Sequence, residues 1–325
     1  MMKRRAFASL LAALALSLAA ATGSALAQSA DGWRWESAAP APQARSELSA
    51  VTDGSFIYLL GGFADVAGGA PRDVFRYDPA ADSWTTLAPL PAGINHAGIA
   101  IVEGRLFVLG GYVEATFTPT AAVRVLDLAT NAWSDAAAMP TARGALAAVV
   151  VDGRIHAIGG HDGELSVSTH EIYDPADGAW ESAAALAHPR NHHTAAAVDG
   201  EIYVFGGRNE ETMEMTPTEA YDSQADSWQP KAPMPTGRSG IASAVVDGKI
   251  IVFGGERFGD ARKTFDEAEE YDIASDSWKA LPPMPTARHG LGAANVGGRI
   301  YVLGGGPQPG LTYSNVNEVL APASP

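Results

Sequence analysis

The sequence predicts an all-β protein, a six-bladed β-propeller with four antiparallel strands in each blade. A tryptophan lies 26 residues before each of six Gly-Gly doublets, which follow one another at intervals of 47 to 50 residues. Repeats of this length, each marked by glycine and an aromatic residue, are typical of propeller blades. The doublets begin at Gly61, Gly110, Gly159, Gly206, Gly254 and Gly304, and the tryptophans are Trp35, Trp84, Trp133, Trp180, Trp228 and Trp278.

Each repeat carries the marks of four short strands. A run of small apolar residues ends at an Asp-Gly-like pair such as Asp152-Gly153, which supplies the positive φ of a tight hairpin turn. A second apolar run, such as 202–205, leads into the doublet. The third strand carries a pair such as Tyr221-Asp222, and the fourth begins at the tryptophan seven residues after that tyrosine.

The two ends of the chain complete one blade. Trp35 occupies the place of a fourth strand, but no three strands precede it, and a third strand near 317–320 ends the last repeat without a tryptophan. The N-terminal strand is therefore predicted to complete the C-terminal blade and close the ring. Closure removes two exposed sheet edges that would otherwise favour aggregation.

With the doublet, the Tyr-Asp pair and the tryptophan in phase, the repeats resemble kelch repeats from about Trp33 to Leu320. The resemblance implies a six-bladed kelch propeller of the kind that bacteria export. Kelch-type copper oxidases need a cysteine cross-linked to tyrosine, and this chain has no cysteine. The sequence also has no Gly-x-Ser-x-Gly, phosphate-loop or His-Glu-x-x-His motif, so we predict no catalytic residue and no cofactor.

Residues 1–27 read as a signal peptide, and 28–325 as a single propeller domain. A basic start at Lys3, Arg4 and Arg5 precedes an apolar run, and small residues at 25–27 suit a signal peptidase. The adjacent arginines leave twin-arginine export open beside the general secretory route. We therefore expect a periplasmic or secreted protein, with no lipid anchor because no cysteine can be acylated.

The net charge of the mature chain limits the classes of partner that it can bind. Removing three basic residues leaves 19 Lys and Arg (22 minus 3) against 37 Asp and Glu, a net charge of −18. This charge argues against nucleic acid and anionic membrane surfaces as partners. The lack of cysteine excludes disulfides, thiolate metal sites and thiol catalysis. We expect a monomer without a membrane anchor.

One face of the predicted propeller is the better candidate for ligand binding. The loops between second and third strands vary most, with 14 to 17 residues from each doublet to the third-strand Tyr or Leu. Variable loops on a rigid scaffold are the usual place for recognition. The alternative is that these loops vary because nothing constrains them.

Two sets of residues are expected on that face. The residues ten positions after the tryptophans include five arginines, whose guanidinium groups suit carboxylate, phosphate or sulfate. In kelch domains that capture acidic peptides, arginines at this motif position are similar in role. Arginine at this spot also belongs to the common kelch pattern, where it ties neighbouring blades together, so both roles stay open. The five are Arg45, Arg143, Arg190, Arg238 and Arg288.

The second set directly follows the doublets and has an aromatic and a charged side. Phe63, Tyr112 and His161 come from adjacent blades, and Arg208 and Glu256 from the next two. Aromatic faces beside charged groups suit a sugar acid or an extended peptide. The alternative is that these aromatic residues pack on their own blades.

The histidines do not predict a metal site by themselves. His96 lies in the second repeat, His192 and His193 in the fourth and His289 in the sixth, and only the closed ring could bring them together. Histidines that face the channel or solvent are the favoured interpretation, so we expect no bound copper or zinc.

The sequence thus favours an exported binding module for an acidic small ligand, glycan or peptide. An alternative is a periplasmic isomerase of acidic sugars, because the sialic-acid mutarotases are similar in compartment and architecture. No catalytic residue of that class can be matched to this chain. A purely structural scaffold is the second alternative.

Overall fold

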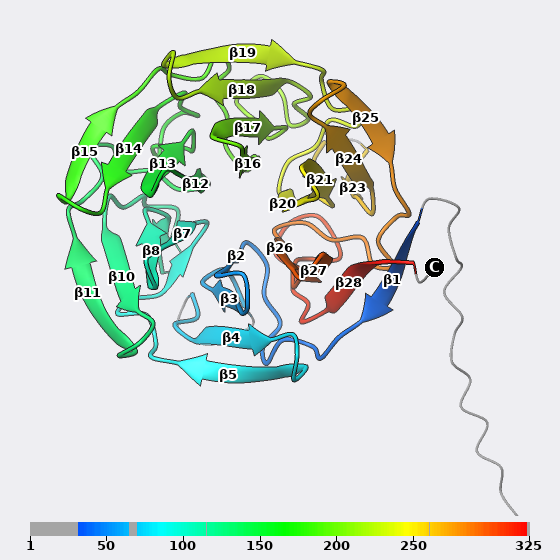
Figure 1. Cartoon of the computed structure of the whole chain (residues 1–325), viewed down its shortest axis with the longest axis horizontal. Coiled ribbons are helices and arrows are strands. Elements are labelled where there is room, and N and C mark those ends of the chain that lie inside the picture. The colour runs from blue at the N-terminus through cyan, green and yellow to red at the C-terminus, as the bar shows by residue number, and fades with distance from the viewer. Residues whose placement is uncertain (1–31, 65–69, 115, 260, 324–325) are drawn as a thin grey trace, which may run out of the picture.

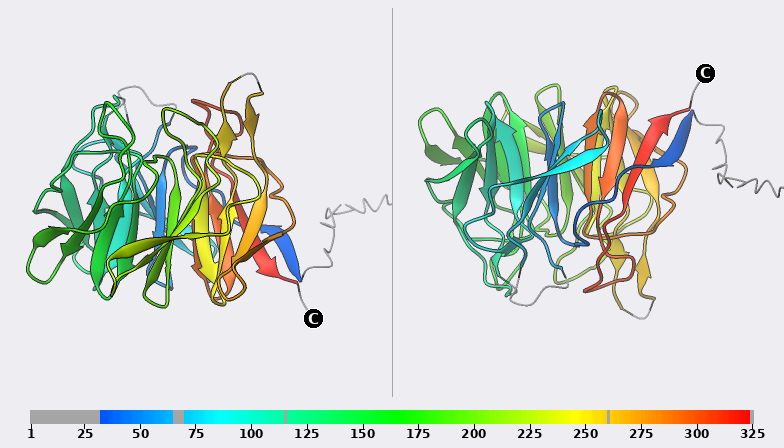
Figure 2. Two further views of the ribbon diagram at one scale, coloured as in Figure 1. Left: turned by 90° about the horizontal axis from the view of Figure 1, so that it is seen from above. Right: turned by 90° about the horizontal axis from the view of Figure 1, so that it is seen from below.

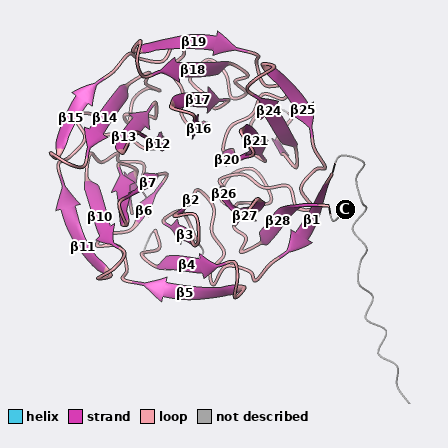
Figure 3. Cartoon of the chain, viewed as in Figure 1, coloured by secondary structure: helices cyan, strands magenta, loops and turns pink. Residues whose placement is uncertain are grey.

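The computed structural model describes residues 32–64, 70–114, 116–259 and 261–323. Six four-stranded antiparallel sheets surround a central axis, as the sequence predicts (Figure 1). Strands and loops account for all of the described residues (Figure 3), and among them no helix is long and apolar enough to cross a membrane. The predicted signal peptide lies outside the described residues.

The strands occupy equivalent places in all six blades, which follow one another in chain order from blade 1 to blade 6. The innermost strands are β2 (Ser49–Thr52), β7 (Gly98–Val102), β12 (Ala147–Val151), β16 (Thr194–Val198), β20 (Ala242–Val246) and β26 (Gly292–Val296). The second strands are β3 (Ile57–Leu60), β8 (Arg105–Leu109), β13 (Arg154–Ile158), β17 (Glu201–Phe205), β21 (Lys249–Phe253) and β27 (Arg299–Leu303).

The third and fourth strands form the outer half of each blade. The third strands are β4 (Val74–Asp78), β10 (Val123–Asp127), β14 (His170–Asp174), β18 (Thr218–Asp222), β24 (Ala268–Asp272) and β28 (Asn317–Pro322). The fourth strands are β5 (Ser83–Leu87), β11 (Ala132–Ala136), β15 (Ala179–Ser182), β19 (Ser227–Lys231), β25 (Ser277–Ala280) and β1 (Trp33–Ser37). Two short ribbons pair β6 (Ile94–Asn95) with β9 (Tyr112–Val113), and β22 (Glu256–Arg257) with β23 (Lys263–Thr264).

The predicted ring closure is confirmed. Strand β1 pairs with β28 in antiparallel register, from Trp33 opposite Pro322 to Ser37 opposite Glu318. The blue and red strands therefore lie side by side in the last blade (Figure 1).

Five of the six inner hairpins have the predicted two-residue turn. Both turn residues have positive φ in these hairpins, as at Asp152 (50°) and Gly153 (76°), which matches the twist of the flanking strands. Blade 1 differs, because four residues (53–56) separate β2 from β3. There the Asp53 carboxylate accepts hydrogen bonds from the backbone N–H of Ser55 and Phe56.

The tryptophans link each blade to the preceding one, which explains their constant spacing. The indole N–H of each of the six repeat tryptophans donates to a backbone carbonyl just after the fourth strand of the preceding blade, at 2.7–3.0 Å. Trp84 in blade 1, for example, reaches Ala39, which follows β1 in blade 6. Trp35 reaches Pro282, so the link is complete around the ring.

The hydrophobic core lies between neighbouring blades. Leu59 and Tyr77 of blade 1, for example, pack in one buried cluster with Tyr301 and Leu303 of blade 6. The innermost strands are rich in alanine, because six of them converge on the axis and leave little room for large side chains. They enclose a channel cavity of about 410 Å³.

A buried histidine pair in blade 3 should make the stability of the protein sensitive to acid. His156 takes the place of Tyr58, Tyr203 and Tyr301 in sister strands, and its Nδ1 lies 2.9 Å from His170 Nε2. Burial lowers the pKa of His156 to about 3 and the pKa of His170 to about 4. In the unfolded chain both pKa values return to about 6.5. The unfolded state therefore binds more protons below about pH 6.5, and stability falls as the pH drops.

The double variant His156→Phe/His170→Val should lose less stability in acid than the wild type does. Phe107 and Val123 occupy these two positions in blade 2, so the replacements have a precedent in the same fold. Urea denaturation between about pH 7 and pH 4 should give a flatter dependence of the free energy of unfolding for the variant. An equally steep loss in both proteins would show that other groups cause the acid sensitivity.

Candidate functional site at the propeller axis

One face of the propeller carries the links between blades and the loops between second and third strands, and we call it the loop face. The strands run between the loop face and the opposite face (Figure 2). Among the described residues, four large apolar side chains are exposed, and all four lie in second-to-third-strand loops. They are Phe117 (64%), Leu165 (58%), Met213 (43%) and Leu311 (66%). We call them the apolar rim, and they mark the face that the loop lengths predict.

The five arginines do not line the mouth of the channel, which corrects one of the two roles that the sequence left open. Arg45, Arg143, Arg190, Arg238 and Arg288 are all 0% exposed. Their guanidinium groups lie inside the blades, where they bond to backbone carbonyls and acidic side chains. They are therefore not available to a ligand on the loop face.

Four of the five arginines pair with a glutamate on the third strand of the same blade. Arg190 lies 2.6 Å from Glu219, and Arg288 lies 2.8 Å from Glu318. The other pairs are Arg143 with Glu171 and Arg238 with Glu269. In blade 1 a phenylalanine, Phe75, takes the place of this glutamate, and Arg45 stacks over its ring at 4.8 Å. The sequence signal for this structural role was that four of the five blades with the arginine also have a glutamate in the third strand.

Six residues encircle the axis in the left-handed conformation, with φ between 51° and 66°. Each lies two positions after one of the five arginines or after Ile94, which takes the place of the arginine in blade 2. We call them the left-handed ring, and they are Glu47, His96, Ala145, His192, Gly240 and Gly290. From His96 to Gly290, each backbone N–H donates to the carbonyl of the preceding member, at 2.8–3.2 Å.

Glycine adopts this conformation freely, whereas residues with side chains adopt it at a cost in stability. Strain of this kind concentrates at functional sites. Glu47, His96 and His192 therefore stand out, since glycine fills the same place in blades 5 and 6.

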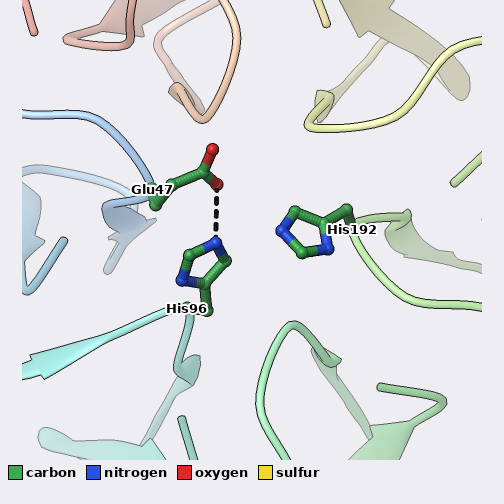
Figure 4. Close-up of side chains that lie close together, drawn as sticks. All are labelled: Glu47, His96 and His192. Carbon is green, nitrogen blue, oxygen red and sulfur yellow. Dashed lines mark ion pairs between the residues drawn. The ribbon is translucent and has the colours of Figure 1, made fainter. Parts of the chain in front are cut away.

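These three side chains converge over the channel from three different blades (Figure 4). Glu47 Oε2 lies 3.2 Å from His96 Nε2, and the rings of His96 and His192 are 4.7 Å apart. Below them is a cavity of about 90 Å³, which Glu47, His96 and His192 help to line. His193 is not part of this group, because its ring packs against Gly159 in blade 3.

Three further side chains extend the group from blades 4, 5 and 6. Arg208 donates to His192 Nε2 at 2.8 Å and to Glu256 Oε1 at 3.0 Å. His289 Nε2 lies 3.4 Å from Glu256 Oε2 and 3.5 Å from Glu47 Oε1. We call the six side chains the axial cluster: Glu47, His96, His192, Arg208, Glu256 and His289.

Of the five residues predicted after the doublets, four lie at or beside the axial cluster and one lies apart from it. Phe63 and Tyr112 are buried and pack edge-on against His96, with ring centroids 5.7 and 5.4 Å away. Arg208 and Glu256 belong to the axial cluster. His161 lies apart, half-buried and 3.9 Å from Glu210. The aromatic and charged sides that the sequence predicts therefore meet at the axis, but mostly below the surface.

The carboxyl groups of the axial cluster have pKa values displaced in opposite directions. Burial opposes ionisation of Glu47, but the imidazoles of His96, His192 and His289 outweigh it and hold its pKa below the ordinary value. Burial and the negative charge of Glu47 raise the pKa of Glu256. Two nearby carboxyl groups with separated pKa values are the arrangement used for acid–base chemistry.

Burial, reinforced by Arg208, lowers the pKa of His192 well below its ordinary value. Its imidazole is therefore neutral at physiological pH. The neutral imidazole accepts the hydrogen bond from Arg208 at Nε2, so its lone pair becomes available to another group only when Arg208 moves away.

Sequence comparison identifies the repeats. The family model for the KLHDC2/KLHL20/DRC7 Kelch-repeats domain matches residues 31–187 and 181–306. The chain belongs to this kelch-repeat family. No curated protein matches this kelch propeller. Among solved structures it resembles the one titled "Structure of YjhT", with a TM-score of 0.75 and 16% identity over 86% of this chain and 95% of that chain. At this identity the likeness shows the fold alone.

Sequence reasoning missed Glu47 as a site residue, and it considered His96, His192 and His289 together but did not favour a shared site. Aligning the repeats at their tryptophans would have revealed the signal, because Glu47, His96 and His192 all lie twelve residues after a tryptophan. The alignment gives no side-chain direction, so it could not show that they meet.

Proposed function

We propose that this kelch propeller is an exported, monomeric binding module that captures a glycan, small polar molecule or short peptide on its loop face. The apolar rim carries this proposal, since every exposed large apolar side chain among the described residues belongs to that face. An apolar rim around a polar centre suits a ligand that has both a hydrophobic face and hydrogen-bonding groups.

The burial of the five arginines weakens the reason for expecting a strongly acidic ligand. In the axial cluster the remaining cation with partial exposure is Arg208, at 18%, and it already pairs with Glu256. An acidic ligand would compete for Arg208 with that carboxylate. We therefore extend the proposed ligands to neutral sugars and peptides beside acidic ones.

A thermal-shift screen of neutral oligosaccharides, carboxylated sugars and short peptides tests this proposal. A ligand at 100 times its Kd should stabilise the protein by about 2.7 kcal/mol. The double variant Phe117→Ala/Leu311→Ala should then bind the same ligand about tenfold more weakly, because exposed aromatic and apolar anchors dominate such contacts.

Gln224→Ala is the matched control, since this exposed residue lies in a turn on the opposite face. It should bind the ligand as the wild type does. If the rim variant binds normally and Gln224→Ala binds weakly, the ligand uses the opposite face. If no compound in the panel shifts the melting temperature, the scaffold alternative gains.

A second candidate function is an isomerase acting on sugars. Glu256 favours it, because this carboxyl group is buried between Arg208 and His289 and its pKa is raised. Enzymes use carboxyl groups whose pKa is raised by their surroundings to donate and accept protons. Anomer exchange followed by NMR should be faster with the wild type than with Glu256→Gln. Equal rates would exclude this role for Glu256.

A further inference from the structure

Two histidines of the left-handed ring share an arrangement that the other blades lack. His96 and His192 each follow an asparagine, and each Nδ1 lies within hydrogen-bond distance of that asparagine's Oδ1. For His96 the distance to Asn95 is 2.6 Å. The asparagines occur only where the ring residue is histidine, since the sister positions hold Ser46, Gly144, Ser239 and His289.

The asparagine amides are themselves held in orientation. Asn95 Nδ2 donates to the carbonyl of Glu114 at 2.7 Å, and Asn191 Nδ2 donates to Ser166 Oγ at 2.7 Å. Each Oδ1 is thus left to accept the proton on Nδ1 of the following histidine. The Nε2 atom of His192 then carries a lone pair, which accepts a hydrogen bond from Arg208. The Nε2 atom of His96 lies 3.2 Å from Glu47 Oε2, where a metal ion would take the place of the proton between them. Metal-binding histidines are oriented in this way, with the distal ring N–H donated to a fixed acceptor.

Glu47 supplies an oxygen ligand at the same point. The ligand atoms of Glu47, His96 and His192 all lie within 4.8 Å of one another. Glu47 Oε2 and His96 Nε2 are 3.2 Å apart. Two ligands that each lie about 2.0–2.1 Å from a tetrahedral ion are separated by about 3.3 Å. The observed separation therefore fits a shared metal ion.

We propose that Glu47, His96 and His192 bind one divalent transition-metal ion, with Zn²⁺ as the reference ion. Two imidazole nitrogens and one carboxylate oxygen form a ligand set that zinc accepts, and a fourth position stays open toward the axial cavity. This reverses the expectation from sequence, because the closed ring brings together histidines that lie 96 positions apart. The proposal is independent of the ligand proposed for the loop face.

Arg208 is the competitor for this site. Its guanidinium donates to His192 Nε2 at 2.8 Å, so it must release His192 before a metal can bind there. A second group of possible ligands, Glu47, Glu256 and His289, is less suitable. The Glu256 oxygens already accept hydrogen bonds from Arg208 and from the backbone N–H of Gly310.

Isothermal titration of the tag-free, EDTA-treated protein with Zn²⁺ tests the proposal. The wild type should bind one ion per chain. His96→Ala, His192→Ala and Glu47→Ala should each abolish that binding. Asn95→Ala should weaken it about 10–100-fold, because the support of His96 is lost. Arg208→Gln should bind Zn²⁺ more tightly than the wild type, since a competing cation is removed.

Ala145→Gly is the matched control, because it alters the left-handed ring without changing a metal-binding side chain, and it should bind Zn²⁺ normally. The alanine variants should fold, since Ala145 adopts the same conformation in blade 3. Circular dichroism of each variant checks that it is folded. The proposal fails if the wild type binds no Zn²⁺, or if the folded ligand variants bind it as the wild type does. Binding of a loop-face ligand is measured with the rim variants in EDTA, where no metal is present. A failure of metal binding can therefore be told apart from a failure of ligand binding.

Discussion

Trp35→Ala should lower the free energy of unfolding by about 3–5 kcal/mol, although the residue lies close to the first described residue of the chain. The Trp35 side chain is only 5% exposed and packs edge-on against Phe253, with ring centroids 6.1 Å apart. Its indole N–H also donates to the carbonyl of Pro282 in the preceding blade. Because β1 has a single neighbouring strand, β28, these contacts hold the ring closed.

Urea denaturation measures this effect, with Trp133→Ala as the comparison. Trp133 makes the equivalent hydrogen bond but is partly exposed, so its loss should cost less. Trp35→Phe should be intermediate, because it retains apolar contacts and loses one hydrogen bond. If Trp35→Ala unfolds at the same urea concentration as the wild type, β1 does not close the ring in solution.

Arg143→Ala should also destabilise the protein by about 3–5 kcal/mol. The guanidinium of Arg143 is fully buried and pairs with Glu171, whose side chain is 4% exposed. It also donates to the carbonyls of Thr141 and Ala157. Truncating Arg143 leaves a buried carboxylate without a cation, and this costs more than the pair itself contributes.

Arg154→Ala is the matched control in the same blade. Arg154 pairs with Glu181, but both side chains are well exposed, so its loss should cost less than about 1 kcal/mol. Arg143→Met/Glu171→Leu should be less destabilising than Arg143→Ala, because no charge remains buried. Any ligand that binds the loop face should still bind folded Arg143→Ala. Lost binding with unchanged stability would restore the ligand-contact role.

The sequence by itself determined the number of blades, the closing strand and the face with variable loops. These features depend on local spacing. A strand has a fixed rise per residue, an Asp-Gly pair turns the chain at once, and each tryptophan must reach the same carbonyl of the preceding blade. The constant interval from tryptophan to doublet was therefore enough to predict the architecture.

Only the tertiary structure decided which polar residues could meet a ligand. The sequence placed Arg143 near the channel mouth, but the direction of its side chain depends on Glu171 in another strand. Glu47 and His289 lie 242 residues apart, yet ring closure brings them within 3.5 Å. A repeat pattern records the position of each residue in its own blade. Distances between blades are set by packing and closure, so the axial cluster exists only in the folded ring.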